Sequence, residues 1–372
     1  MSATPDSSST PGLSSPTPSS PAPSSPAPFS PAPFSRASLP PVSPSPAVAS
    51  HAVPSASNRR RRSNRVPPAS GKPGPFDAHR RLTSRDRLLL SWLAEHYLLS
   101  SDQVTRALFT NPRTAQQRLT ILHRLGFLTA IPRGRDDGAP RPWLYTLGPL
   151  GLHLHSEAYS DPDNRRLKPP RSSVERARRI IASPQAEHFL GVNQFFVDLH
   201  AHTRSHPHAH LIRWWSERHA TEVYSGGRGA YGHADIHPDG HGIWQVERHT
   251  GTYRVGFFLE LDRSTENLAR VVGKLRGYET LARFGPRYPV LLWVPDQRRE
   301  TSLLRALDGI DTAMPVATAV QQPNPAGPIW ALSTDPYQRR ALHQLPSHAG
   351  PDAPTNPDRA QAQHAEQDSG DE

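Results

Sequence analysis

The chain has 372 residues, a formal net charge of +10, 42 prolines and a hydrophobic fraction of only 35%. Such a proline-rich chain with little apolar surface cannot order along its whole length, and its positive charge favours a polyanionic partner. The absence of cysteine excludes disulfides and zinc–thiolate sites, and no apolar run reaches the ~20 residues of a membrane span. We therefore expect a cytoplasmic protein that does not enter a membrane.

Residues 1–77 form an arm of Ser, Pro and Ala repeats that ends in a basic cluster. Proline fixes φ and removes backbone donors, so we expect this arm to be disordered. Five arginines fall within residues 59–65. Such a cluster suits phosphate binding beside a DNA reader and equally suits a solvated linker.

Residues 78–155 contain the spacing of three helices. The first is expected over 82–97, with a buried face of Leu88, Leu89, Trp92, Leu93 and His96. Ser100 can cap the second helix, with Gln103 three residues later completing a capping box. Val104, Ala107 and Leu108 supply the apolar side of this helix.

The third helix is expected to begin after Asn111, with Pro112 in its first position, and to end before Gly126. Two short apolar segments follow, 127–131 and 143–147, with a basic loop between them. Three helices followed by two strands and a basic loop are typical of a winged helix-turn-helix.

One side of the third helix is apolar, and the other carries groups that pair with base edges. Arginine suits guanine and glutamine suits adenine, so a polar face of this kind fits the major groove, although an ordinary solvated helix looks similar. The predicted DNA-binding residues of this helix and of the basic loop are Arg113, Gln116, Gln117, Thr120, Arg124, Arg133, Arg135 and Arg141.

A linker over 156–182 precedes a second domain, expected over 183–335, and residues 336–372 read as a disordered tail. The second domain alternates predicted helices (184–203, 264–284, 296–307) with predicted strands (209–215, 232–237, 243–248, 254–262, 288–294, 328–332). A hairpin turn is expected over 238–240. This alternation predicts an α/β sheet. Many histidines fall between 200 and 249, and we expect them at the surface because they are scattered over several elements.

Three carboxylates are candidates for a metal site. Glu260 and Asp262 are two residues apart and would share one face of a strand, and Asp235 would join them from a neighbouring strand. Mg²⁺ prefers such oxygen ligands, and a phosphodiester nuclease would use it. The alternative is structural: Glu260 or Asp262 pairs with Arg254 or Arg263, or Asp262 lies near the start of the next helix.

The same region resembles the replication-relaxation family of plasmids and integrated elements of actinobacteria and other Gram-positive bacteria. The resemblance spans about 80–310 and is strongest in the string Glu260-Leu-Asp262-Arg-Ser-Thr-Glu266. His233-Ala-Asp235-Ile and Lys274-Leu-x-x-Tyr278 also carry it. It implies a role in plasmid replication and DNA relaxation through DNA binding.

The second domain is also similar to the restriction-endonuclease-like fold, whose motif is Asp, then Asp/Glu-x-Lys on the next strand. Asp235 and Glu260 would take the acidic positions and bind Mg²⁺, the one cofactor that these residues suggest, and Glu187 could add an acid from the preceding helix. Asp262 occupies the position of the motif's lysine. Lys274, the one lysine of this domain, could replace it from the following helix.

We therefore expect an α/β protein with an N-terminal winged helix-turn-helix, a mixed-sheet restriction-endonuclease-like domain and disordered termini. Its expected partners are double-stranded DNA and other plasmid replication or transfer proteins. Two alternatives stay open: a metal-dependent DNA nuclease or nickase with Asp235, Glu260, Asp262 and Lys274 as its catalytic residues, and a winged-helix transcriptional regulator.

Overall fold

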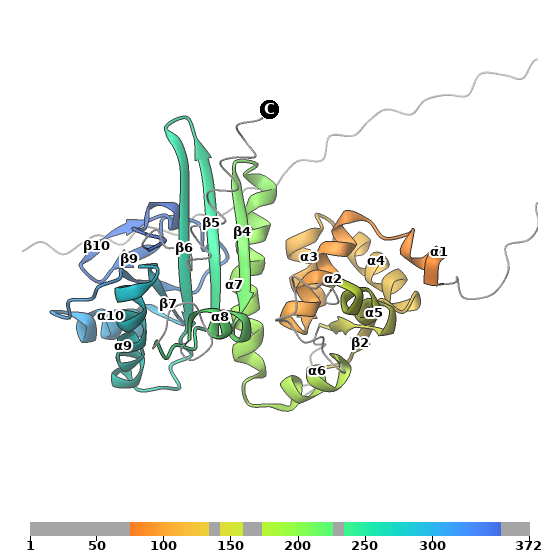
Figure 1. Cartoon of the computed structure of the whole chain (residues 1–372), viewed down its shortest axis with the longest axis horizontal. Coiled ribbons are helices and arrows are strands. Elements are labelled where there is room, and N and C mark those ends of the chain that lie inside the picture. Colours follow the sequence, from red (N-terminus) through yellow and green to blue (C-terminus); the bar gives the residue numbers. More distant parts are fainter. Residues whose placement is uncertain (1–74, 134–141, 159–172, 226–233, 351–372) are drawn as a thin grey trace, which may run out of the picture. The chain divides into compact units, whose positions relative to one another are not determined.

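The computed structural model describes residues 75–133, 142–158, 173–225 and 234–350, which all fall in one compact unit, Ala69–Glu372. It shows a mixed α/β protein (Figure 1). The predicted arm and the residues of the tail beyond 350 lie outside the described residues. Among the described helices, none combines the length and the apolar character needed to cross a membrane.

The N-terminal part contains the three predicted helices and a small antiparallel sheet. The three helices follow a short α1 (Pro75–His79) and are α2 (Ser84–His96), α3 (Ser101–Leu108) and α4 (Pro112–Arg124). Strands β1 (Leu99–Ser100), β2 (Leu128–Ile131) and β3 (Leu144–Leu147) pair in the order β1-β3-β2. Helix α5 (Pro149–Ala158), which extends past the predicted boundary at 155, completes this part.

Local capping explains where these helices begin. Thr83 caps α2 and Ser100 caps α3, each with a complete capping box, and Ser100 uses Gln103 as predicted. The predicted buried face of α2 needs one correction: Leu88 is 37% exposed, and Leu90 is buried in its place. Gly126 follows α4 with a φ of 86°, the left-handed conformation expected at that position.

The C-terminal part is built on a seven-stranded sheet in the order β10-β9-β8-β7-β6-β5-β4. Strands β4 to β6 form an antiparallel meander, and β6, β7 and β8 are parallel. The strands are β4 (Ala209–Ser216), β5 (Gly240–Arg248), β6 (Gly251–Leu261), β7 (Val290–Val294), β8 (Val316–Val320), β9 (Trp330–Leu332) and β10 (Asp335–Arg340).

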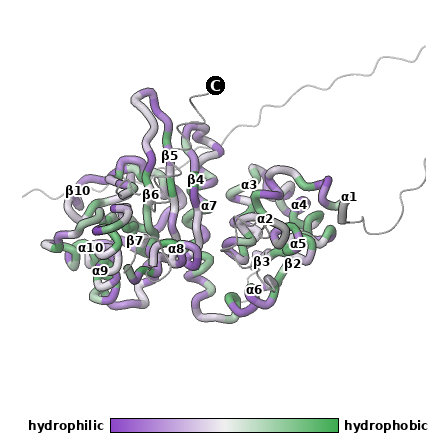
Figure 2. The backbone as a smooth tube through the Cα atoms, in the orientation of Figure 1, coloured by the Kyte–Doolittle hydropathy of each residue, from purple (hydrophilic) through white to green (hydrophobic). Residues whose placement is uncertain are grey.

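Helices cover both faces of this sheet. Helix α7 (Ala186–Ser205) packs on one face, where Phe195 lies among Phe257 and Trp293. The other face is covered by α8 (Glu217–Tyr224), α9 (Leu268–Phe284) and α10 (Gln297–Leu307). Hydrophobic residues are dense along β7 and along the second half of β6, which are buried on both faces (Figure 2).

Two sequence predictions in this domain are wrong. The described residues of the expected strand 232–237 are irregular, and residues 238–240 lead into β5 without forming a hairpin turn. The antiparallel turn lies between Arg248 and Gly251, where β5 meets β6. At the other end, β10 and the 3-10 turn Leu342–Gln344 extend the ordered chain past the predicted limit of 335.

Candidate functional site

The polar side of α4 is open to solvent. Asn111 Oδ1 accepts a hydrogen bond from the Arg113 amide at 2.8 Å and so fixes the first turn. Ala115, Leu119 and Leu122 are buried beneath the helix. The predicted base-reading side chains point away from these buried residues. The exposed ones are Arg113, Gln116, Gln117 and Arg124, and Thr120 is half-buried.

Two members of the predicted DNA-binding set differ from the others. Thr120 donates to the Gln116 carbonyl at 2.8 Å, so its hydroxyl is engaged within the helix. Arg133, at the end of β2, forms an ion pair with Glu187 of α7, and its side chain is only 15% exposed. Arg135 and Arg141 lie outside the described residues.

Glu260 is the centre of a buried polar group on the sheet face that α9 covers. Phe257, Leu259 and Leu261 turn toward α7, so Glu260 turns toward α9 by strand alternation. Its carboxylate accepts hydrogen bonds from Lys274 Nζ at 2.8 Å and from Tyr278 Oη at 2.6 Å. Glu260 and Lys274, both named from the sequence as candidate catalytic residues, are therefore in contact.

Asp239, and not Asp235, is the acid that faces Glu260. Asp239 and Glu260 are called the acidic group below. Gly240 pairs with Leu259, which sets Asp239 opposite Glu260 at the start of β5. Asp239 Oδ2 accepts from the Leu261 amide at 2.7 Å, and its Oδ1 lies 3.0 Å from Nε2 of His188. Burial, helped by the charge of Asp239, raises the pKa of Glu260 to about 7, although Lys274 opposes the shift.

The structure does not bring Asp235 into this group. Its side chain is 89% exposed and lies 3.3 Å from His237, and its backbone carbonyl packs against Gly277 of α9. The sequence placed Asp235 on a strand because Ala234 and Ile236 alternate with it. These two apolar residues instead pack against α9 as an irregular segment.

Asp262 and Glu187 are engaged elsewhere. Asp262 follows the end of β6, accepts from Arg299 Nε at 2.5 Å, and accepts from the Ser264 amide at 2.7 Å. It therefore ties the end of the strand to α10 through Arg299, and not through Arg254 or Arg263. Glu187 is half exposed and pairs with Arg133.

Within the described ranges, no group of three or more His, Asp or Glu side chains could hold a metal ion. Mg²⁺ can bind through only one or two protein carboxylates and complete its shell with water or phosphate oxygens. Asp239 and Glu260 are therefore the residues that could hold such an ion, with the Lys274 ammonium beside them.

The expectation of surface histidines is wrong for His241. Its ring is fully buried, donates from Nδ1 to the Phe257 carbonyl at 2.8 Å, and stacks on Tyr288. His233 lies outside the described residues. His188, which lies outside the predicted histidine cluster, contacts Asp239 of the acidic group.

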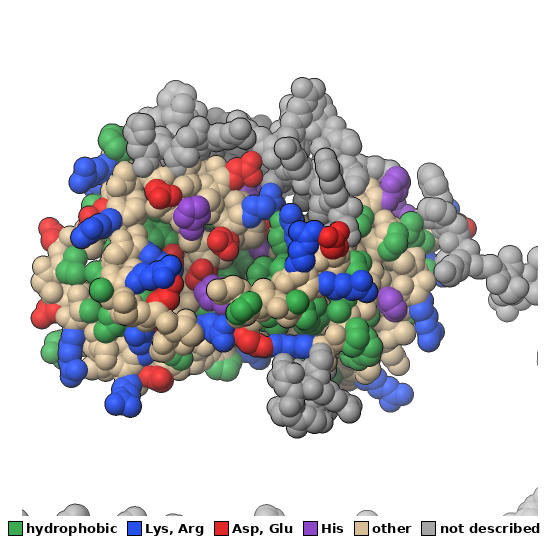
Figure 3. Space-filling view, turned by 90° about the horizontal axis from the view of Figure 1, so that it is seen from below, with side chains coloured by type: hydrophobic (Ala, Val, Ile, Leu, Met, Phe, Trp, Pro, Cys, Tyr) green, Lys and Arg blue, Asp and Glu red, His purple; other side chains and the backbone are tan. Residues whose placement is uncertain are grey.

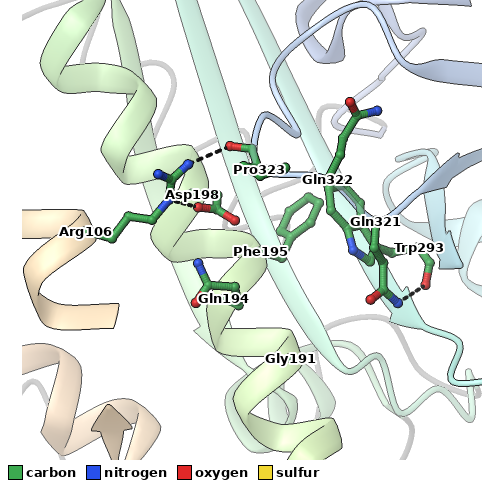
Figure 4. Close-up of a pocket in the computed structure, with 9 residues that line it drawn as sticks. All are labelled: Arg106, Gly191, Gln194, Phe195, Asp198, Trp293, Gln321, Gln322 and Pro323. Atoms are coloured by element: carbon green, nitrogen blue, oxygen red, sulfur yellow. Dashed lines mark hydrogen bonds and ion pairs between the residues drawn. The ribbon is translucent and has the colours of Figure 1, made fainter. Parts of the chain in front are cut away.

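A cavity of about 490 Å³ lies between α3, α7 and the segment after β8 (Figure 4). Asp198, a buried acid of α7, pairs with Arg106 of α3, and Arg106 also donates to the Pro323 carbonyl at 2.9 Å. Phe195 and Trp293 form its apolar wall. No residue of this cavity belongs to the sets predicted from the sequence.

One comparison with known proteins finds a family that this chain resembles. The family model described as Replication-relaxation matches residues 90–290, which is more than half of the chain. Neither the curated proteins nor the solved structures include one that matches.

Proposed function

Because the chain belongs to the replication-relaxation family, we propose that it binds double-stranded DNA during the replication and relaxation of a plasmid or mobile element. In this proposal, residues 75–158 are a winged helix-turn-helix, and α4 is the helix that enters the major groove. Other replication or transfer proteins of the element would then be recruited to the bound site.

The observation that carries this proposal is the exposed polar face of α4. Arg113, Gln116 and Gln117 extend from a helix whose opposite side is buried, and an arginine and a glutamine can each make two hydrogen bonds to one base. Arg118, which interrupts this face, is held by Asp86 through its Nε at 2.9 Å. The cations of the helix thus divide into one that stabilises the fold and two, Arg113 and Arg124, that face solvent.

The test is a gel-shift titration of the double variant Arg113→Ala, Gln116→Ala on duplex DNA selected by the unmodified protein. Each good base contact contributes ~1–3 kcal/mol, so we expect the affinity for the selected sequence to fall at least about tenfold and its preference over random duplex to shrink. A control variant, Arg298→Ala with Arg305→Ala on the exposed side of α10, should bind like the unmodified protein. Unchanged affinity in the α4 variant would contradict the assignment.

A second function, metal-dependent nicking of DNA, is favoured by the opposed Asp239 and Glu260. This proposal follows the likeness to the restriction-endonuclease-like fold, with Asp239 in the acidic position expected of Asp235 and with Lys274 supplied from α9. Here Asp239 and Glu260 would hold Mg²⁺, which activates water and stabilises phosphoryl charge when bound. Lys274 would hold its ammonium beside the Glu260 carboxylate, and Tyr278 would fix the other oxygen of that carboxylate.

Supercoiled plasmid incubated with the protein and Mg²⁺ or Mn²⁺ tests this second function. We expect nicking that Asp239→Asn and Glu260→Gln each abolish, and that Asp235→Asn leaves unchanged because its carboxylate is in solvent. The reverse order, with Asp235 essential and Asp239 dispensable, would refute the assignment. Duplex binding without any nicking would exclude the nuclease function. The protein would then be a DNA-binding protein that acts either as a replication factor or as a transcriptional regulator.

A further inference from the structure

Helix α6 (Ser173–Ala182) is anchored to the N-terminal part by one face. The Ser173 hydroxyl donates to the Leu147 carbonyl of β3 at 2.6 Å, and Ala177 is buried. Ile180 and Ile181 pack against a small core that includes Ile131 and Leu144 of the strands β2 and β3. The helix therefore has a fixed inner face, and its outer face is fixed with it.

The outer face of α6 is cationic. Arg176, Arg178 and Arg179 are exposed, and the single acid, Glu175, pairs with Arg179 four residues on. Both partners of this pair are solvent-exposed, so the pair is weak and an excess of positive charge stays on the helix. A solvated helix with this composition would need no further explanation, but Arg176 has a defined position.

Arg176 lies over the ring of Tyr97, with its guanidinium carbon 4.5 Å from the ring centroid. Tyr97 has a φ of 61°, an uncommon conformation for a residue with a side chain. Arg176 and Tyr97 line one wall of a cavity of about 590 Å³, and Glu217 and His237 belong to its lining. Arg218, also in this lining, is already paired with Glu95 and Glu222.

The first turn of α7 contacts both parts of the proposed site. Glu187 pairs with Arg133 at the end of β2, and the next residue, His188, contacts Asp239 of the acidic group. Through these contacts, the end of β2 and the start of β5 meet at the first turn of α7. On the face seen in Figure 3, Lys and Arg side chains lie interspersed with Asp, Glu and His side chains.

We infer that α6 is a second DNA-binding element, which grips the phosphate backbone of duplex DNA between the winged helix and the acidic group. This inference rests on the proposed function, since it assumes that α4 binds the same duplex. Arg178 and Arg179 would contact phosphates from the exposed side, and Arg176 would contact the backbone at the rim of the cavity. These contacts carry no sequence information, in contrast to those of α4.

The salt dependence of binding tests this inference. Each phosphate contact contributes about 0.9 to the slope of log K against log salt for duplex DNA. The full-length triple variant Arg176→Gln, Arg178→Gln, Arg179→Gln should therefore lower this slope by about 2 to 3 and leave sequence preference unchanged. The triple Arg→Lys variant at the same positions should keep the slope, because it retains the charge.

A matched control removes the same charge elsewhere: Arg283→Gln, Arg298→Gln, Arg305→Gln, three exposed residues of α9 and α10. This control should keep the slope of the unmodified protein. An unchanged slope in the α6 variant, or a loss that the lysine variant does not restore, overturns the role of α6 while DNA binding by α4 stands. Failure of the unmodified protein to bind duplex overturns both proposals.

Discussion

His96, the last residue of α2, is fully buried and stacks on Trp214 of β4 with ring centroids 4.0 Å apart. Burial lowers its pKa to about 4, and the neighbouring Glu95 only partly opposes the shift. The unfolded chain binds a proton at His96 near pH 6.5, whereas the folded chain does not until about pH 4. The free energy of unfolding should therefore fall as the pH falls through this window.

Between pH 7 and pH 5 this residue alone should lower the free energy of unfolding by about 2 kcal/mol. His96→Phe keeps an aromatic ring against Trp214 and cannot titrate, so its urea unfolding curves should change less between the two pH values. Other buried histidines titrate in both proteins, and the difference between the two proteins isolates His96. An identical pH dependence in the variant would rule out this role.

The acidic residues show how far single positions could be predicted. Glu260 and Lys274 were both named from the sequence as candidate site residues, and the structure places Lys274 Nζ 2.8 Å from the Glu260 carboxylate. Asp239 was missed, since Pro238-Asp239-Gly240 has the composition of a hairpin turn. The available signal was its position directly before an apolar strand, where a side chain faces the end of the antiparallel neighbour.

Elements with their own start and stop residues were predicted to within a few positions. Helices α3 and α4 carry capping residues at their N-termini, and the hydrophobic strand β6 is almost entirely apolar in its second half. Local chemistry determines such elements, so the sequence is sufficient for them.

Elements held by their neighbours escaped prediction. Strand β10 has no buried alternation and exists through its pairing with β9. Strand β8 is short, and its pairing with β7 completes the parallel core. Helix α8 follows β4 without a break and is fixed by Ala220 and Tyr224 packing against the sheet. Tertiary contacts select these elements, and no local pattern reports them.

At the scale of the whole molecule, hydrogen bonds join the N-terminal helices to α7. Gln103 of α3 donates to the Leu190 carbonyl at 2.8 Å, and Asn193 donates to the Leu98 carbonyl at 3.1 Å. Arg204 donates to the Phe109 carbonyl at 2.9 Å and to the Arg106 carbonyl at 2.7 Å, at the end of α3. The partners are about 90 residues apart in the sequence, so nothing in either segment alone predicts them.

These bonds should make the two parts of the folded chain unfold together. In the unmodified protein, we expect far-UV circular dichroism and tryptophan fluorescence to report one urea transition, since each broken bond would leave a buried carbonyl without a donor. Asn193→Ala with Arg204→Gln removes the donors to Leu98 and to the end of α3, and it should lower stability by about 2–4 kcal/mol.

The same double variant should also separate the two transitions, because packing within each part is left intact. A control at exposed positions, Arg283→Gln with Arg305→Gln, should unfold in one step like the unmodified protein. Two transitions already present in the unmodified protein would mean that the α3–α7 contacts do not couple the parts. In that case DNA bound at α4 could not be held in a fixed position relative to Asp239 and Glu260, and the nicking proposal would lose its geometric basis.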